Sequence, residues 1–137
     1  MPAYLLDSGI LIRHLRNRPG YHGLVKGLNS AGDVSISAFT RVEVVRGMRE
    51  HERERTFALL DGFITHPIDR ATADRAGELL RAWQSRGVIL GGPDAIIAAS
   101  ALQVGAVLIT TNARHFPMPE LVVLAADEDG QLTPVNR

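Results

Sequence analysis

The 137-residue sequence contains no cysteine. That absence excludes disulfides, thiolate catalysis and cysteine-based zinc sites, and it is compatible with the cytoplasmic location that we expect. The apolar run within residues 1–18 is interrupted by Asp7 and Arg13, so we expect neither a signal peptide nor a membrane span there. Because internal repeats, low-complexity tracts and linkers are also lacking, the sequence predicts a single domain over residues 1–137.

An excess of charge of either sign is missing as well. The 15 basic and 15 acidic residues give a net charge of zero, so the chain lacks the global basic excess typical of nucleic-acid-binding proteins. Lys26 is the only lysine, and arginine suits bidentate contacts to phosphate or carboxylate. Arginines and glutamates alternate over residues 41–55, which favours a solvated, salt-bridged helix. An alternative interpretation places arginines from residues 13–16 and 46–49 along an RNA groove.

Short apolar runs alternate with helical periodicity along the chain. The runs predict strands at residues 3–6, 34–37, 106–109 and 121–124, with a brief extended piece at 66–68. The periodicity predicts helices at residues 8–15, 21–28, 38–63, 71–86 and 93–103. Continuous apolar strands between helices are typical of a parallel sheet covered on both faces. The predicted fold class is α/β, with a central, mostly parallel sheet flanked by helices.

Three polar residues fall where such a sheet carries its functional sites, outside the carboxyl ends of the strands. Asp7 follows the first strand, Asn112 follows the strand at 106–109, and Asp94 opens the neighbouring helix. Each also has a structural explanation. Asp7 is a candidate helix cap, Asp94 suits the first turn of a helix after Pro93, and Asn112 suits a turn. Considered singly, the structural roles are favoured.

Glu43 is harder to explain by structure alone. It lies between Val42 and Val44, with Phe39 and Gly47 four residues to either side on its own helix face. A solvated face is usually more polar, although an ion pair with Arg46 one turn away would also account for it. The two interpretations have equal weight on the pattern.

Convergence of Asp7, Glu43 and Asp94 would call for a cation. Two carboxylates about 4 Å apart repel by roughly 4 kcal/mol at an effective dielectric constant near 20. Oxygen ligands without cysteine or a histidine pair favour Mg²⁺ or Mn²⁺. Such an ion activates water and neutralises charge on a phosphate. The convergence hypothesis therefore predicts phosphodiester hydrolysis.

Four sequence blocks, in order, resemble PIN-domain proteins, and specifically the VapC type of toxin ribonuclease. The blocks are YLLDSGILIRHL, ISAFTRVEVVRG, GGPDAIIAASAL and LITTNARHF. The resemblance covers nearly the whole chain and implies a PIN-like fold with metal-dependent endoribonuclease activity. It implies metal coordination by Asp7 and Asp94, an acid role for Glu43, and a fourth catalytic position at Asn112. That fourth position is often aspartate in the family, so Asn112 makes hydrolysis with one metal ion the safer expectation.

The resemblance further implies partners and supporting residues. It predicts an RNA substrate, a small cognate antitoxin whose tail lies across the site, and a homodimer. Ser8, Thr40 and Thr111 are candidates for orienting waters or ligands. His115 is a candidate for contact with substrate phosphate, although turn histidines rarely do this. A non-catalytic binding module on the same scaffold remains the main alternative, because Asn112 weakens the acidic cluster.

Overall fold

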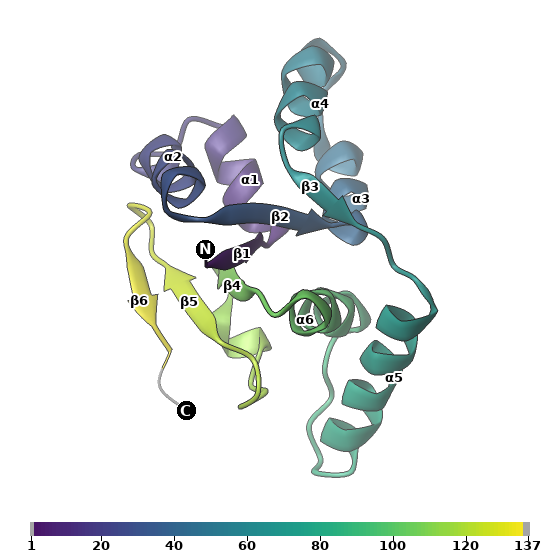
Figure 1. Ribbon diagram of the computed structural model, residues 1–137. Coiled ribbons are helices and arrows are strands. Elements are labelled where there is room, and N and C mark those ends of the chain that lie inside the picture. Colours follow the sequence, from purple (N-terminus) through teal and green to yellow (C-terminus); the bar gives the residue numbers. More distant parts are fainter. Residues whose placement is uncertain (1, 136–137) are drawn as a thin grey trace.

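The computed structural model describes residues 2–135, which form one six-stranded sheet with helices on both faces (Figure 1). The strands are β1 (Ala3–Leu6), β2 (Asp33–Ser37), β3 (Ile64–His66), β4 (Val107–Thr110), β5 (Val123–Ala126) and β6 (Leu132–Pro134). The helices are α1 (Ser8–Leu15), α2 (Tyr21–Ala31), α3 (Ala38–Gly47), α4 (Arg53–Asp61), α5 (Arg70–Gln84) and α6 (Gly92–Val104), and two short 3-10 helices are η1 (Glu50–Glu52) and η2 (Ala113–His115). Between residues 2 and 135, no helix has the length and apolar character needed to cross a bilayer.

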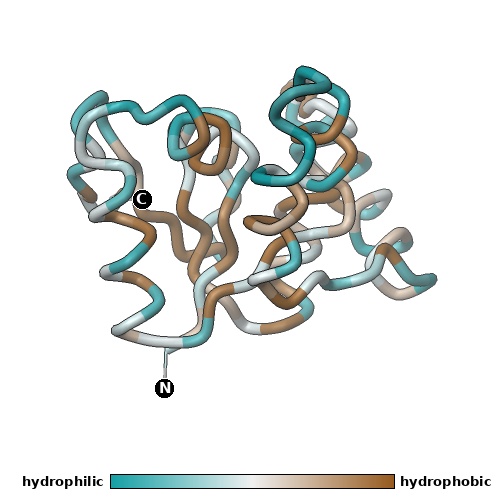
Figure 2. The backbone as a smooth tube through the Cα atoms, turned by 90° about the horizontal axis from the view of Figure 1, so that it is seen from above, coloured by the Kyte–Doolittle hydropathy of each residue, from teal (hydrophilic) through white to brown (hydrophobic). Residues whose placement is uncertain are grey.

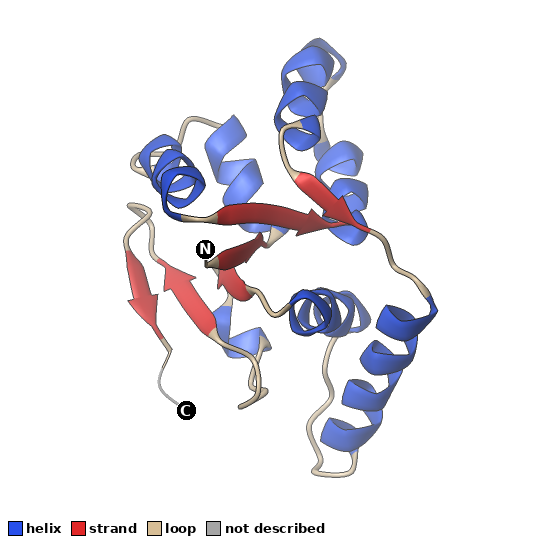
Figure 3. Ribbon diagram, in the orientation of Figure 1, coloured by secondary structure: helices blue, strands red, loops and turns tan. Residues whose placement is uncertain are grey.

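The sheet confirms the predicted α/β class. Its strand order is β3-β2-β1-β4-β5-β6, and only β6 pairs in the antiparallel direction, against β5 (Figure 3). Leu5 pairs with Ser35 on one side, and Leu6 pairs with Ile109 on the other. Because β1, β2 and β4 run in parallel, their carboxyl ends lie at the same edge of the sheet.

Two apolar cores cover the two faces of the sheet. Leu5 and Leu108 belong to the core beneath α5 and α6, whereas Leu6 and Ile109 belong to the core beneath α1 and α2. Consecutive strand residues point to opposite faces, so each apolar strand serves both cores. Figure 2 shows the result, with apolar segments in the interior and hydrophilic segments on the outer helices and loops. The core residues named above have no exposed surface: Leu5, Leu6, Leu108 and Ile109.

Helix α3 lies at the carboxyl edge of the sheet and contacts both cores. It starts directly after β2, where the Ser37 side chain accepts a hydrogen bond from the Phe39 backbone N–H at 3.1 Å. Phe39 packs against the α5–α6 core and Val44 is buried in the other. This position carries Glu43 past the ends of β1 and β2.

The predicted helix over residues 38–63 is wrong in its middle part. The chain becomes extended at Met48 and Arg49, forms η1, and restarts as α4. Glu52 stabilises the break, since its Oε1 accepts a hydrogen bond from the Arg49 backbone N–H at 2.8 Å. The sequence pattern favoured a continuous helix through the charged segment, but this hydrogen bond holds the break between α3 and α4.

Two strands are displaced from their predicted positions and one was not predicted. The extended piece expected at 66–68 is β3 at Ile64–His66, because Pro67 has no N–H with which to continue a strand. The strand expected at 121–124 is β5 at Val123–Ala126. The sequence did not predict the antiparallel β6, because its residues, Leu-Thr-Pro, do not form an apolar run.

Candidate active site

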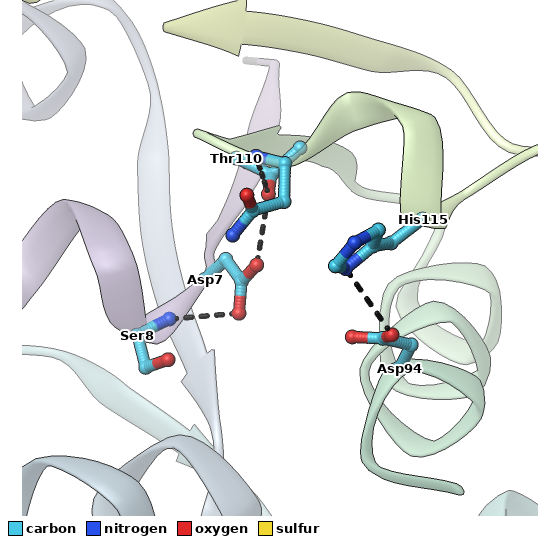
Figure 4. A network of polar contacts seen from close by, with 6 residues as sticks. Asp7, Ser8, Asp94, Thr110 and His115 are labelled. Carbon is cyan, nitrogen blue, oxygen red and sulfur yellow. Dashed lines mark hydrogen bonds and ion pairs between the residues drawn. The ribbon is translucent and has the colours of Figure 1, made fainter. Parts of the chain in front are cut away.

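Asp7 is fixed at the junction of β1 and α1 by hydrogen bonds to both carboxylate oxygens (Figure 4). Its backbone N–H extends the pairing with β4 by donating to the Ile109 carbonyl at 3.0 Å. Oδ1 accepts from the Ser8 backbone N–H at 2.8 Å, and Oδ2 accepts from the Thr110 hydroxyl at 2.8 Å. The structural explanation as a helix cap is therefore correct, and the same carboxylate lies at the sheet edge.

Thr110 connects Asp7 to the turn that follows β4. Its side chain is fully buried, and its Oγ1 also accepts a hydrogen bond from the Asn112 backbone N–H at 3.0 Å. The backbone of Asn112 is thus held next to Asp7, while the residue itself is exposed. The catalytic role predicted for the Asn112 side chain stays a prediction.

Asp94 stands in the first turn of α6, one residue after Pro93, as its sequence position predicted. Its Oδ2 lies 3.5 Å from Nδ1 of His115, which belongs to η2. Figure 4 shows the two side chains directed toward each other, with Asp7 lying apart from both, to their left in the view. The contact leaves Asp94 partly exposed, with 31% of its side chain accessible.

Glu43 is half-buried on α3, within electrostatic range of both aspartates. Burial raises the pKa of Glu43, and the negative charges of Asp7 and Asp94 raise it further. The Ser8 side chain and, more weakly, Arg46 act in the opposite direction on this pKa. Among residues 2–135, the ion pairs do not include one between Glu43 and Arg46, so surface pairing does not explain this carboxylate.

The three carboxylates form a site in which ionisation is disfavoured. Burial raises the pKa of Asp7 and of Asp94, as it does that of Glu43. The charge of Asp7 raises the pKa of Asp94, whereas His115 lowers the pKa of both aspartates. Desolvation and mutual repulsion are the two physical causes, and a bound cation would oppose both. Asp7, Glu43 and Asp94, which lie far apart in the sequence, are therefore near enough in space for the charge of Asp7 to raise the pKa of the other two.

The carboxylate oxygens of Asp7 and Asp94 fit a divalent cation that keeps several of its waters better than a cation enclosed by protein ligands alone. No three Asp, Glu or His side chains in the described part of the chain lie close enough to hold one ion between them. Mg²⁺ commonly keeps several waters and binds through one or two carboxylates plus substrate phosphates. Each oxygen of Asp7 accepts one hydrogen bond from the protein, and a carboxylate oxygen can accept about two. Asp7 and Asp94 thus retain lone pairs for such an ion.

The sequence missed two contacts in the site. Thr110 rather than Thr111 donates to Asp7, and His115 contacts Asp94 rather than standing alone in a turn. A threonine at the end of a buried strand was visible in LITTNARHF, but the choice between two adjacent threonines depends on which face of β4 each occupies. The Oγ1 of Thr40 is buried without a hydrogen-bond partner among the described residues. The supporting roles of Ser8, Thr40 and Thr111 stay predictions.

Carboxylates at the end of β1, on α3 and on α6, near the carboxyl edge of a mostly parallel sheet, define a class of α/β protein with an acidic site at that edge. Comparison with known proteins identifies the family within this class: the PIN domain family model matches residues 4–119. Ribonuclease VapC10 of Mycobacterium tuberculosis is 34% identical over 116 residues, which are 85% of this chain and 87% of the relative. Ribonuclease VapC19 of the same organism is 34% identical over 119 residues, which cover 85% of this chain and 95% of the relative.

A solved structure agrees with these relatives. A toxin-antitoxin complex from Klebsiella pneumoniae contains a chain that matches with a TM-score of 0.74 and 30% identity, over 87% of this chain and 95% of that chain. The chain belongs to the PIN-domain family. The predicted resemblance to VapC-type ribonucleases and the predicted PIN-like fold are thereby confirmed.

Proposed function

We propose that the protein is a metal-dependent endoribonuclease that cleaves RNA by hydrolysis at the site formed by Asp7, Glu43 and Asp94. The observation that supports it best is that Asp7, between β1 and α1, and Asp94, in the first turn of α6, flank the carboxyl edge of the sheet, while Glu43 on α3 is near enough for both aspartates to raise its pKa. A fold alone would not require this, because burying several carboxylates near one another destabilises the protein unless a cation compensates them. Membership of the PIN-domain family and similarity to ribonucleases support the same proposal.

The proposal gives each residue a separate task. Asp7 and Asp94 hold Mg²⁺ or Mn²⁺, with Thr110 and Ser8 fixing the orientation of the Asp7 carboxylate. When bound, the cation supplies a water of lowered pKa and offsets negative charge on the phosphate. Glu43, whose pKa is raised by burial and by both aspartates, would act as the acid: it would give a proton to the oxygen that leaves the phosphate and regain one from the attacking water. Asn112 contributes a neutral amide, which is why a single metal ion is proposed.

Cleavage of structured RNA by the purified protein in Mg²⁺ or Mn²⁺ tests the proposal directly. We expect cleavage by the wild type, a loss of at least about 100-fold in Asp7→Ala and Asp94→Asn, and no cleavage when the metal is chelated. Asp74→Asn, an exposed carboxylate change on α5, is the matched control and should retain full activity. Equal cleavage by all four proteins, or none by any, would overturn the proposal.

We also propose that the enzyme acts as the toxin of a toxin–antitoxin pair. Under this proposal residues 1–137 act as one domain in the cytoplasm, as a homodimer, with a small cognate antitoxin covering the acidic site. Similarity to a chain of a solved toxin-antitoxin complex supports the partner. Co-expression with the product of an adjacent short reading frame should yield a complex that no longer cleaves RNA. Undiminished cleavage by such a complex would count against the covered site.

The alternative is a PIN-like binding module with weak or no catalysis. It is favoured by Asn112, which replaces a fourth carboxylate and is exposed, and by the lack of three closely grouped acidic ligands in residues 2–135. The two functions differ in the cleavage assay. A binding module would retain RNA binding in the wild type and in Asp94→Asn, with no product in either metal.

A further inference from the structure

A second feature borders the acidic site on the side of α6. A cavity of about 250 Å³ lies between the loop that precedes α6 and the short helix η2. We call it the flanking pocket, and the residues that matter to its chemistry are Val88, Ile89, Leu90, Asp94, Arg114 and His115. Asp94 belongs to both the pocket and the acidic site, so whatever occupies the pocket adjoins the proposed reaction centre.

One wall of the flanking pocket is apolar and unusually accessible. Ile89 has 89% of its surface exposed and Val88 has 39%, while Leu90 beneath them is buried. A single exposed apolar residue needs no explanation. Two consecutive ones that line a cavity next to a catalytic carboxylate are different, because their exposure contributes nothing to the folded core and leaves an apolar surface for a ligand.

The opposite wall carries groups that suit a phosphate-linked ligand. Arg114 and His115 come from η2, and the His115 ring lies beside Asp94 (Figure 4). Arg114 is exposed, and the ion pairs within residues 2–135 do not include it. A guanidinium at the mouth of an apolar pocket can contact a phosphate while the pocket takes the apolar part of the same molecule.

We propose that the flanking pocket binds one unpaired nucleobase of the RNA, next to the phosphate that is cleaved, with Ile89 against the base and Arg114 at the backbone. This assignment rests on the proposed function. The volume favours a single base, since pockets for drug-sized ligands begin at about 300 Å³. An unpaired base is required because a base inside a duplex is stacked on both faces, whereas a splayed base offers a face to a side chain.

Short RNAs carrying the fluorescent base 2-aminopurine test the assignment. A Glu43→Gln background keeps the strand intact in Mg²⁺, and 2-aminopurine is moved through successive positions of an unstructured hexaribonucleotide. We expect a fluorescence change on binding at one position only. In that background Ile89→Ala should weaken binding by at least about fivefold, the lower end of the range found when a side chain that contacts the base face is removed. Arg114→Ala should also weaken binding, and because it removes a phosphate contact the loss should be larger at low salt than at high salt.

Matched substitutions far from the pocket provide the controls. Ile64→Ala replaces an exposed isoleucine at the start of β3, and Arg70→Ala replaces an exposed arginine at the start of α5. Both should bind the probe within about twofold of the parent. If Ile89→Ala and Arg114→Ala behave like these controls, or if a duplex of the same sequence binds equally well and with the same dependence on Ile89, the assignment is overturned.

Cleavage by the otherwise wild-type protein separates this inference from the proposed function. Ile89→Ala should raise KM for an unpaired substrate more than it lowers kcat, and it should change the preferred cleavage position. Binding that depends on Ile89, without cleavage in either metal, would support the pocket and overturn hydrolysis. Cleavage that is insensitive to Ile89 and Arg114 would support hydrolysis and overturn the pocket. Neither binding nor cleavage would overturn both.

Discussion

Asp7 combines a structural role and a proposed chemical role in one carboxylate. It caps α1 through Ser8 and is held by Thr110, yet burial still raises its pKa. The hydrogen bonds from Ser8 and Thr110 lower that pKa, so they offset part of the desolvation but not all of it. The site is therefore held in place by the fold and remains electrostatically unsatisfied without a cation.

Asp7→Asn should stabilise the protein at neutral pH when divalent cations are chelated. Because the pKa of Asp7 is raised in the folded state, ionising it destabilises the fold above that folded pKa, and the penalty disappears below about pH 4, where the unfolded aspartate is also protonated. The melting temperature of Asp7→Asn should therefore exceed that of the wild type at pH 7.5, with the difference closing as the pH falls.

Asp74→Asn on α5 is the control for that experiment, since it removes an exposed carboxylate from a helix. The difference in melting temperature between Asp74→Asn and the wild type should not change with falling pH in the same way. A lower melting temperature for Asp7→Asn at every pH would mean that the two hydrogen bonds of the carboxylate outweigh its desolvation.

Thr110→Val should destabilise the protein by about 1–3 kcal/mol, the cost of leaving a buried polar group without its partner. The substitution keeps the shape of the side chain but removes the donor to Asp7 and the acceptor for the Asn112 N–H. Urea unfolding measures the loss. Thr110→Ser keeps the hydroxyl and should recover most of the stability and RNA cleavage; equal losses in both variants would point to packing instead.

At the scale of the elements, the sequence predicted the strands and helices that show a clear pattern of apolar residues. The strands at β1, β2 and β4 and the helices at α1, α5 and α6 follow from runs of buried residues and are confirmed within a few residues. The elements that it missed depend on local contacts or on pairing. The break before α4 depends on the hydrogen bond between Glu52 and Arg49, and β6 exists because β5 offers it a free edge.

Gly9→Ala tests how tightly α1 approaches the turn after β4. A Cβ at Gly9 would lie 2.6 Å from Oγ1 of Thr111 and 3.2 Å from Nη1 of Arg13, so these side chains, the helix or the turn must move. Since Asp7 and Thr110 lie on these two segments, we expect lower RNA cleavage and no gain in stability, although alanine favours helices over glycine by about 1 kcal/mol.

Gly23→Ala on α2 provides the comparison, because a Cβ there meets nothing within 4 Å. It should raise the free energy of unfolding by up to about 1 kcal/mol and leave cleavage unchanged. If Gly9→Ala matches it in both measurements, the close approach of α1 has no bearing on the site.

At the scale of the whole molecule, binding of Mg²⁺ should stabilise the fold. A ligand at ten times its Kd stabilises the state that binds it by about 1.4 kcal/mol, so the melting temperature should rise with Mg²⁺ concentration. Asp94→Asn should show a much smaller rise, because it removes one of the two proposed ligands. NaCl at equal ionic strength controls for screening. An equal rise in both proteins would argue against Asp94 as a ligand.

The positions of the acidic residues could be predicted from the sequence, but the hydrogen bonds and ion pairs around them could not. The strand and helix pattern places Asp7, Asp94 and Asn112 near one sheet edge, whereas Glu43 entered as a hypothesis of convergence, and the roles of these residues stay predictions. The contacts with Thr110 and His115 depend on the register between β1 and β4 and on the course of η2. A single sequence does not encode register in any local pattern, so those partners required the structure.

The hydrogen bond between Asp7 and Thr110 spans 103 positions of the chain, which has a consequence for synthesis on the ribosome. Chains are made from the N-terminus, and contacts between distant segments form only after both have emerged. A nascent chain that ends before β4 contains all three carboxylates but lacks the strand that positions Asp7. For a protein proposed to destroy RNA, the translating ribosome and its message are thus exposed to an assembled site only after β4 has emerged.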